Sequence, residues 1–419
     1  MKKCCLLIFS MHVIFSSCKE ETNNNVFHQT DDKGVVIATP YIWKTSLHQQ
    51  EPMSNSHISN QIIYNDNVVV PRTNENNSRS ISLLDSKDGK ILWDWSDFYK
   101  EHSEYVDLYF HYQIDNLLMY QWGSKSYCIN LDNGSTKWRH TRDLSFDVRI
   151  DPNDQYYFTY AEINNNGYAE TIAFKGYIQT GIISEFKIRN SAFHCFDCKS
   201  GINYIIKIPD KENFFLVTYF ENLPDWISQI YYGLYNTNIE EWIWDKVLVR
   251  EPMSPNFIYH APIIVNKKIY TAIVNTIVCH DLETGEQLWR RDFSGDFMFT
   301  GIIVEEGKVI GNCEDTHAYA LDAETGNQLW SVKTAGTGSR MSYLNGVVYM
   351  VGGSGGGRLF AIDASTGKML WRIDAGLLGE GQGARFRTNA VYVLPAKGDQ
   401  PAKVIALSNL YAYCFEAER

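Results

Sequence analysis

Short apolar stretches alternate with polar turns along most of the chain, and the same alternation returns at a regular interval. Its clearest copy is Ala361–Trp371 (AIDASTGKMLW), in which an apolar stretch and an Asp lead into a polar turn with Gly, and a second apolar stretch ends in Trp. Aligned on the turn, the copies are Ser82–Trp93, Tyr127–Trp138, His194–Ile205, Gly233–Trp244, Val278–Trp289, Tyr319–Trp330, Phe360–Trp371 and a degenerate Ile405–Phe415. The turn positions 89, 134, 201, 240, 285, 326 and 367 are mostly 39 to 45 residues apart. That spacing is the size of one four-stranded propeller blade.

Each position of the repeat has an expected structural role. The Asp carboxylate accepts backbone N–H groups in a tight turn, the Gly supplies a positive φ, and the Trp fills the wedge between blades. In the third copy these positions hold Asp197 and Gly201. The residues that define the repeat are Asp85, Gly89, Trp93, Gly134, Trp138, Asp281, Gly285, Trp289, Asp322, Gly326, Trp330, Asp363, Gly367 and Trp371. We expect a ring of structural turns from them, and no catalytic residues.

The repeat predicts an all-β fold, an eight-bladed β-propeller of four-stranded antiparallel blades that spans residues 36–419. One interval departs from the rest, because Gly134 and Gly201 are 67 residues apart. The surplus predicts an insertion near residues 162–180, as an extra hairpin or a long loop on one face.

A second departure predicts how the ring closes. Trp43 is followed by EPMS at residues 51–54, and Trp244 is followed by EPMS at residues 251–254. This shared string places Trp43 in register with the outer-strand tryptophans. A strand near Tyr41–Leu47 is then expected to pair with the C-terminal strand near Val404–Phe415, which leaves no open sheet edge.

The charge balance excludes one class of partner. The formal net charge is −11, from 38 Lys and Arg against 49 Asp and Glu. Nucleic acids bind through basic patches, and no basic run of five residues occurs. We therefore expect no nucleic-acid partner.

The N-terminus carries an export pattern. Lys2 and Lys3 precede an apolar run that ends at Phe15, and two serines follow, which predicts a signal peptide over residues 1–17. The string FSSC ending at Cys18 resembles the lipobox of bacterial lipoproteins, although Phe15 replaces the usual aliphatic residue. This resemblance implies lipidation of Cys18, a membrane anchor and a polar tether over residues 18–35. The expected location is the cell envelope, as an outer-membrane lipoprotein.

The residues directly after Cys18 leave its orientation open. The string CKEE resembles a signal that sends lipoproteins to the outer surface, and a solvated acidic linker is the alternative interpretation. Both a periplasmic and a surface-exposed protein are consistent with it.

The repeat A-x-D-x-x-T-G-x-x-x-W resembles that of the PQQ-like propellers, the quinoprotein alcohol dehydrogenase-like family. The resemblance covers nearly the whole mature chain, and together with the lipobox it extends to the BamB-like lipoproteins. The family contains quinone-dependent dehydrogenases and cofactor-free scaffolds, so the fold alone does not select a function.

The residues that the dehydrogenases use are not matched. They hold the quinone against a disulfide of adjacent cysteines, and the only such pair here is Cys4-Cys5, inside the predicted signal peptide. No string matches their Ca²⁺ or general-base segments. Because these residues are not matched, we expect no cofactor, no metal site and no catalytic residue.

The other cysteines are expected to be structural. Cys128, Cys195 and Cys279 share one register of the repeat and are read as small core residues. Cys195-x-x-Cys198 is half of a zinc pattern without its second half, and it could also form a strained bridge.

Three functions follow as hypotheses. The favoured one is a non-catalytic propeller scaffold that binds a protein or another ligand. The alternatives are a PQQ-dependent oxidoreductase with a divergent site and a carbohydrate-binding surface lipoprotein.

Overall fold

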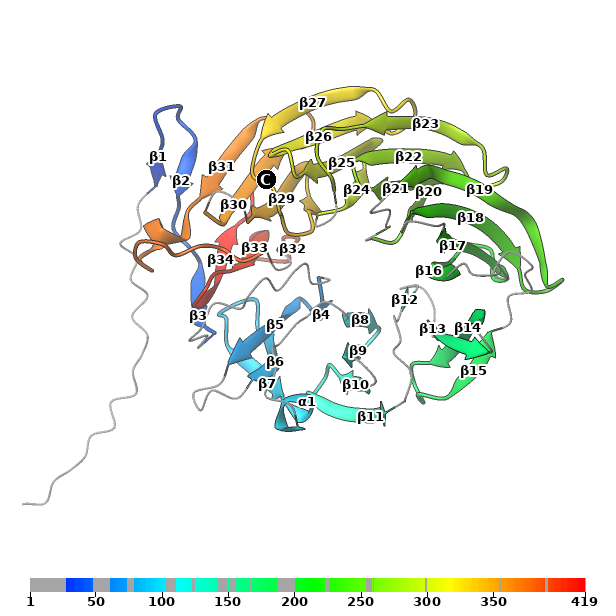
Figure 1. Cartoon of the computed structure of the whole chain (residues 1–419). Coiled ribbons are helices and arrows are strands. Elements are labelled where there is room, and N and C mark those ends of the chain that lie inside the picture. The colour runs from blue at the N-terminus through cyan, green and yellow to red at the C-terminus, as the bar shows by residue number, and fades with distance from the viewer. Residues whose placement is uncertain are drawn as a thin grey trace, which may run out of the picture.

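Eight antiparallel sheets follow one another around a ring in the computed structural model of the chain (Figure 1). The structure describes residues 28–47, 61–73, 79–101, 111–122, 125–141, 149–150, 156–165, 168–186, 200–222, 227–253, 258, 260–297, 300–353, 356–388 and 391–418. This confirms the predicted eight-bladed, all-β propeller. Helices are limited to α1 (Asp97–Glu101) and the 3-10 turn η2 (Ala375–Leu378) within these ranges. None of the described helices is long and apolar enough to cross a bilayer.

Blades one to four each contain four consecutive strands, with the first strand nearest the middle of the ring (Figure 1). They are β4 (Ile63–Tyr64), β5 (Asn67–Thr73), β6 (Arg79–Leu84) and β7 (Ile91–Trp95); β8 (His111–Ile114), β9 (Leu117–Trp122), β10 (Lys125–Asn130) and β11 (Ser135–Thr141); β12 (Arg149–Ile150), β13 (Tyr156–Asn165), β14 (Tyr168–Tyr177) and β15 (Ile183–Phe186); β16 (Ser200–Lys207), β17 (Phe214–Asn222), β18 (Ser228–Asn236) and β19 (Glu241–Met253).

Blades five to eight repeat this order, except that blade seven gains two strands and blade eight takes its outer strand from the N-terminal region. They are β20 (Ile263–Val265), β21 (Lys268–Ile273), β22 (Thr276–Asp281) and β23 (Gln287–Asp292); β24 (Ile302–Glu305), β25 (Lys308–Cys313), β26 (His317–Asp322) and β27 (Gln328–Lys333); β28 (Ser342–Leu344), β29 (Val347–Gly352), β30 (Arg358–Asp363) and β31 (Met369–Ile373), with β1 (Gln29–Thr30) and β2 (Val36–Ala38); β32 (Tyr392–Leu394), β33 (Lys403–Leu407), β34 (Tyr411–Glu416) and β3 (Trp43–Ser46).

The repeat turn joins the third and fourth strands of a blade, and its Asp organises it. In blade six, Asp322 Oδ1 accepts hydrogen bonds from the N–H and the hydroxyl of Thr325, each at 2.8 Å. The N–H of Gly326 closes the turn on the Asp322 carbonyl at 2.8 Å. Gly326 has a φ of 70°, a conformation that a residue with a Cβ adopts at a cost. Asp281 and Asp363 make the same hydrogen bonds in blades five and seven.

The Trp and the Gly of neighbouring blades fit together. The indole N–H of Trp289 in blade five donates to the carbonyl of Ala323 in the blade-six turn, at 3.0 Å. Gly326 of that turn lies over the indole ring, where a Cβ would come within 2.7 Å of Trp289 Cε3. We call this contact a lock. Locks join the pairs Trp43–Gly89, Trp93–Gly134, Trp138–Gly181, Trp244–Gly285, Trp289–Gly326 and Trp330–Gly367.

The ring closes as the sequence predicts. Strand β3 pairs antiparallel with β34, with Trp43 opposite Cys414 and Ser46 opposite Tyr411. Trp43 also donates its indole N–H to the carbonyl of Ser86 in blade one, at 2.9 Å. The N-terminal strand thus completes blade eight and locks it to blade one, which confirms the expected closure.

The predicted position of the third repeat turn, at Gly201, is wrong. Gly201 lies in β16, the first strand of blade four, where it pairs with Phe220. The turn of blade three is Tyr177–Ile182, and its Gly181 has a φ of 71° and lies on Trp138. The turn has Tyr177 where the other repeat turns have Asp or Asn, and β15 has no Trp, so the repeat pattern does not identify this blade.

The corrected position of the turn also changes the interval length from which the insertion near residues 162–180 is predicted. Measured from Gly134 to Gly181, the interval is 47 residues rather than 67. Residues 168–177 form β14, a regular strand of blade three, and β13 and β14 pair along ten residues each. These lengthened strands account for only part of the surplus, because the next interval, from Gly181 to Glu240, is 59 residues.

Part of the predicted tether is also ordered as strand. Residues 1–27, including the predicted signal peptide and Cys18, lie outside the described residues. Within residues 28–35, β1 pairs with β2, and β2 adds in parallel to the outer strand of blade seven, with Val36 opposite Trp371. Arg372 and Asp31 form an ion pair at 3.3 Å across this junction.

Two junctions lack a lock among the described residues. Between blades three and four, β15 offers no Trp, and Glu240 with a φ of 53° takes the place of the turn Gly. Between blades seven and eight, Trp371 instead lies in a core cluster with Tyr413 and Phe415 of β34.

A buried histidine departs from the repeat in blade five. The residue before the turn Asp is apolar and fully buried in most blades, as at Leu84, Ile129, Leu321, Ile362 and Phe415. His280 occupies this position with no exposed surface, and neither ring nitrogen has a hydrogen-bond partner among the described residues. Its ring lies edge-on to Tyr232 of blade four, with centroids 5.2 Å apart. Burial lowers the pKa of His280 to about 4.

The lock predicts that its glycine is needed for fit as well as for backbone conformation. Gly326→Ala should cost the strain of a positive φ, about 1–2 kcal/mol, plus the cost of displacing the Trp289 ring. Gly307→Ala is the matched control, since Gly307 has a φ of 72° and open space around it. Denaturant unfolding measures both. Equal losses for the two variants would show that Trp289 does not constrain this position.

The buried histidine predicts a pH-dependent stability. The folded-state pKa of His280 lies below that of the unfolded chain, so its contribution is present above about pH 6.5 and is lost as the pH falls toward 4. His280→Leu, which restores the residue type of the other blades, should make the loss of unfolding free energy between pH 7.5 and 5.5 smaller by about 1.4 kcal/mol. The exposed His28→Leu is the control. The same pH dependence in both variants and the wild type would contradict the assignment.

Candidate interaction face

The two faces of the propeller carry different turns and connections. Strands alternate in direction, so the repeat turns lie on one face, which we call the lock face. The turns between second and third strands and the connections between blades lie on the other, which we call the connection face. The predicted repeat residues are spread around the lock face, one set per blade, and do not converge on a single site. The side chains that converge are on the connection face of blades five to eight.

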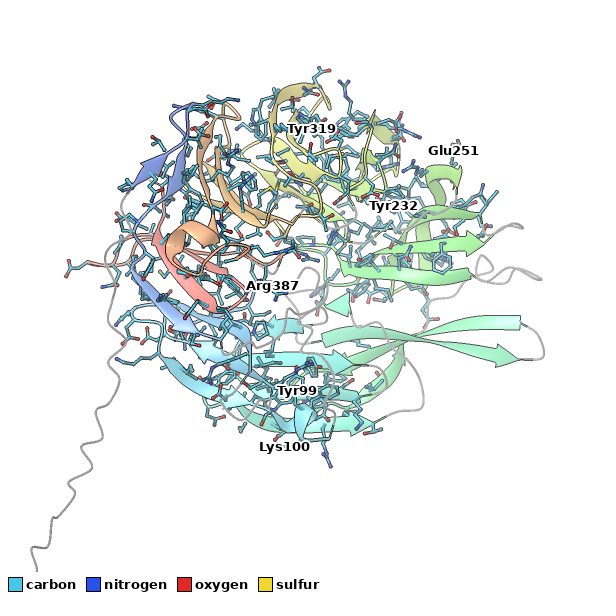
Figure 2. The ribbon with its side chains drawn as sticks, turned by 60° about the vertical axis from the view of Figure 1, so that its left-hand side comes forward. Tyr99, Lys100, Tyr232, Glu251, Tyr319 and Arg387 are labelled. Atoms are coloured by element: carbon cyan, nitrogen blue, oxygen red, sulfur yellow. The ribbon has the colours of Figure 1, made fainter. Side chains whose placement is uncertain are left out.

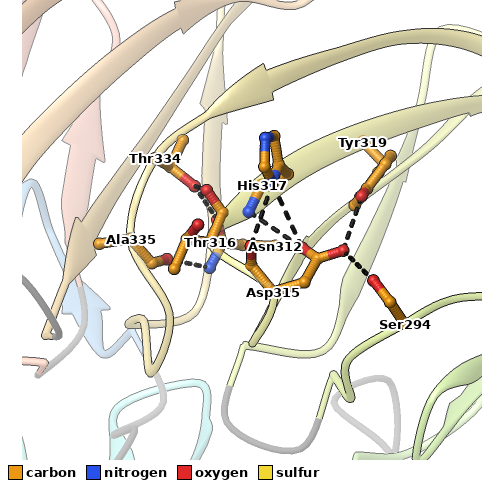
Figure 3. A network of polar contacts seen from close by, with 8 residues as sticks. All are labelled: Ser294, Asn312, Asp315, Thr316, His317, Tyr319, Thr334 and Ala335. Carbon is orange, nitrogen blue, oxygen red and sulfur yellow. Dashed lines mark hydrogen bonds and ion pairs between the residues drawn. The ribbon is translucent and has the colours of Figure 1, made fainter.

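The turn between β25 and β26 is the centre of a hydrogen-bond network (Figure 3). Asp315 Oδ2 accepts from the hydroxyl of Ser294 at 2.8 Å and from that of Tyr319 at 2.7 Å. Asp315 Oδ1 accepts from the backbone N–H of His317 at 3.1 Å. Burial opposes ionisation of Asp315, but the hydrogen bonds from Tyr319 and Ser294 outweigh it, and its pKa lies below the ordinary value. The carboxylate therefore ties the blade five-to-six connection to blade six.

The same turn also holds the next connection. Asn312 donates to the carbonyl of Ala335 at 2.8 Å and accepts from the hydroxyl of Thr334 (Figure 3). Glu314 accepts the N–H of Thr337 at 2.5 Å and its hydroxyl at 2.9 Å. Burial raises the pKa of Glu314 in spite of these two bonds. The loop into blade seven is thus fixed by two side chains, Asn312 at the end of β25 and Glu314 in the turn after it.

Neighbouring blades use equivalent contacts. In blade five, Asn275 donates to the carbonyl of Phe293 at 2.9 Å and accepts from Arg250 at 2.6 Å. In blade seven, the N–H of Val351 donates to the hydroxyl of Ser339 at 2.9 Å. The connections of these blades are held in place by specific hydrogen bonds.

A basic pair lies at the inner side of this face. Arg340 Nη2 is 3.1 Å from His260 Nδ1. Because a guanidinium group only donates, this contact requires His260 Nδ1 to be unprotonated. The pair links the connection before blade five to the connection before blade seven. Arg387 lies nearer the middle of the molecule than Tyr319 (Figure 2), and burial, with Arg385 beside it, lowers its pKa.

The described residues offer no reactive thiol or metal ligand set. Cys128, Cys279, Cys313 and Cys414 are buried and free, and burial raises their pKa values to about 12. Cys128 and Cys279 lie opposite Trp138 and Trp289, in the expected role of small core residues. No group of three or more His, Cys, Asp or Glu in the described ranges is placed to hold a metal ion. Cys195 and Cys198 lie outside these ranges.

Sequence reasoning missed this face because its residues fall between copies of the repeat. One signal was present, since Asn275 and Asp315 occupy the same turn position in adjacent blades. Both carry short polar side chains that bond nearby backbone groups.

The C-terminal part of the chain matches a known family. Residues 243–372 and 319–410 match the family model described as outer membrane protein assembly factor BamB. These segments run from β19 to the turn before β34. No curated protein sequence matches the chain.

Solved structures match over most of the chain. BamB from Moraxella catarrhalis is 13% identical, with a TM-score of 0.54, over 90% of this chain and 98% of that one. The quinohemoprotein alcohol dehydrogenase from Comamonas testosteroni is 11% identical, with a TM-score of 0.59, over 90% of this chain and 77% of that one. Sqt1 from Saccharomyces cerevisiae is 10% identical, with a TM-score of 0.59, over 90% of this chain and 99% of that one. At these identities the likeness shows the fold alone.

Proposed function

Because the chain is a PQQ-like, BamB-like β-propeller, we propose that it is a non-catalytic scaffold of the cell envelope that binds a protein partner through its connection face. The observation that carries the proposal is the network around Asp315, which holds two blade connections against one turn. A surface whose loops are already fixed loses little conformational entropy when it binds.

The chemistry of this face suits a polar, specific interface. The carboxyl groups of Glu314 and Asp315 lie in the same half of the ring as the guanidinium of Arg340, which pairs with the neutral ring of His260. Such mixed charges fix the register of a partner and exclude partners with the wrong pattern. The connections that lead into blades five, six and seven therefore supply both the rigidity and the selectivity that a docking surface needs.

Membrane attachment is the second part of the proposal. Lipidation of Cys18 would join the propeller to a bilayer through buried acyl chains, each methylene of which contributes about 0.8 kcal/mol. An outer-membrane location agrees with the family model that matches residues 243–410. The scaffold would then act on partners held at the same membrane.

Site-specific photo-crosslinking in the native cell envelope tests which face binds. The exposed residues Lys333 and Asn327 flank the ends of β27, on the connection face and the lock face respectively. A photoreactive residue at position 333 should give a discrete protein adduct, and one at position 327 should not. Asp315→Ala should weaken the adduct at 333, whereas Asp399→Ala in an exposed loop should not. Equal adducts at both ends of β27, or none at 333, would reject the connection face as the binding surface.

The anchor predicts a simple fractionation result. Cys18→Ser should leave the protein folded and move it from the membrane fraction to the soluble fraction, because the acylated sulfur would be gone. Alkaline washing of membranes followed by detection of the propeller measures this. A variant that still sediments with washed membranes would show that Cys18 is not the anchor.

A further inference from the structure

The N-terminal strands fix where the chain leaves the propeller. Strand β31 runs from the lock face to the connection face, and β2 runs parallel to it. Strand β1 then runs back along β2, with Gln29 opposite Ala38. The N–H of Asp374, at the end of β31, donates to the carbonyl of Ile37 at 3.0 Å. Strand β1 therefore begins at the connection-face end of blade seven, and β1 lies at the outer edge of the ring (Figure 1).

The length of chain before this point limits its distance from a lipid anchor. Ten peptide bonds join Cys18 to His28. Fully extended they span about 35 Å, and as a flexible chain they span about 18 Å on average. An anchor at Cys18 thus brings the outer edge of blades seven and eight closer to the bilayer than any other part of the ring.

Exposed apolar side chains lie at this edge. Leu377 on η2 and Leu410 in the turn between β33 and β34 are each 40% exposed. The blade seven-to-eight connection reaches that turn, since Phe386 bridges Ser408. The carbonyl of Leu410 accepts the N–H of Leu47 at 2.8 Å, which holds the turn against the closing strand.

Basic and aromatic groups lie on the same elements as these leucines. Lys44 Nζ lies 4.7 Å from the ring centroid of Tyr411, and both side chains are half-buried. Arg385 is exposed on the same connection. The oxygens of the Glu380 carboxylate are buried, so this acid does not present its charge to the surface. Lysine and tyrosine beside exposed leucine are suited to the boundary between lipid headgroups and acyl chains.

We propose that this surface, formed by Leu377, Leu410, Tyr411, Lys44 and Arg385 and here called the membrane edge, lies against the headgroups of the bilayer. The occupant is the lipid surface itself, with leucines at the acyl boundary and the two cations next to lipid phosphates. The inference rests on the proposed anchor at Cys18. The inference adds an orientation to the proposed anchor: the outer edge of blades seven and eight faces the bilayer.

A fluorescent probe tests the orientation in the lipidated, full-length protein. An environment-sensitive NBD label is placed at Leu410→Cys, or at Ile239→Cys as the matched control. Ile239 is 55% exposed and lies in the repeat turn of blade four, away from the membrane edge. Cys195→Ser and Cys198→Ser limit labelling to the new thiol, because the four described thiols are buried. The protein is reconstituted into vesicles of phosphatidylethanolamine and phosphatidylglycerol.

The expected result is a blue shift of NBD emission at position 410 and protection of that label from aqueous dithionite, with neither change at position 239. Lys44→Gln combined with Arg385→Gln should reduce the shift at 410. A label at 410 that stays open to dithionite on vesicle-bound protein would overturn the membrane edge and leave the anchor intact. Mass spectrometry that finds no acyl chains on Cys18, with no flotation of the protein, would overturn the anchor and the orientation together.

Discussion

The contact between a tryptophan and the turn glycine of the next blade holds the ring together. A single blade cannot bury both of its faces, so each depends on its neighbours. The indole N–H fixes the distance between blades by its hydrogen bond to the turn, and the ring face is covered only because the glycine above it has no side chain. The same residue thus serves two needs, the positive φ of its own turn and the close approach of the adjacent blade.

The repeat made the blade count and the closure predictable because each lock residue is encoded in sequence. Trp43 could be assigned to the last blade before its partner strand was known. Blade three could not be found in this way, since Tyr177 replaces the turn Asp and β15 supplies no Trp. The strands β1 and β2 are too short to give a pattern. The connection face was missed for another reason, because its hydrogen bonds join loops that carry no repeat.

Blade four has unusual borders. Its junction with blade three lacks a lock among the described residues, and its junction with blade five contains a histidine where other blades have an aliphatic or aromatic residue. A proton on His280 would place an uncompensated charge beside Tyr232 in that junction. Acid conditions therefore act first on a blade that is already less tightly joined, on the side of the ring opposite the closing strand.

The closing strand also has a consequence for how the chain is made. Strand β3 is synthesised before blades one to seven, and its partner β34 is synthesised after them. The outer strand of blade eight can therefore pair only after those blades have been made. A chain that lacks β34 leaves β3 without its partner strand, and unpaired strand edges are sites of aggregation. Closure of the ring therefore requires strands from both ends of the propeller.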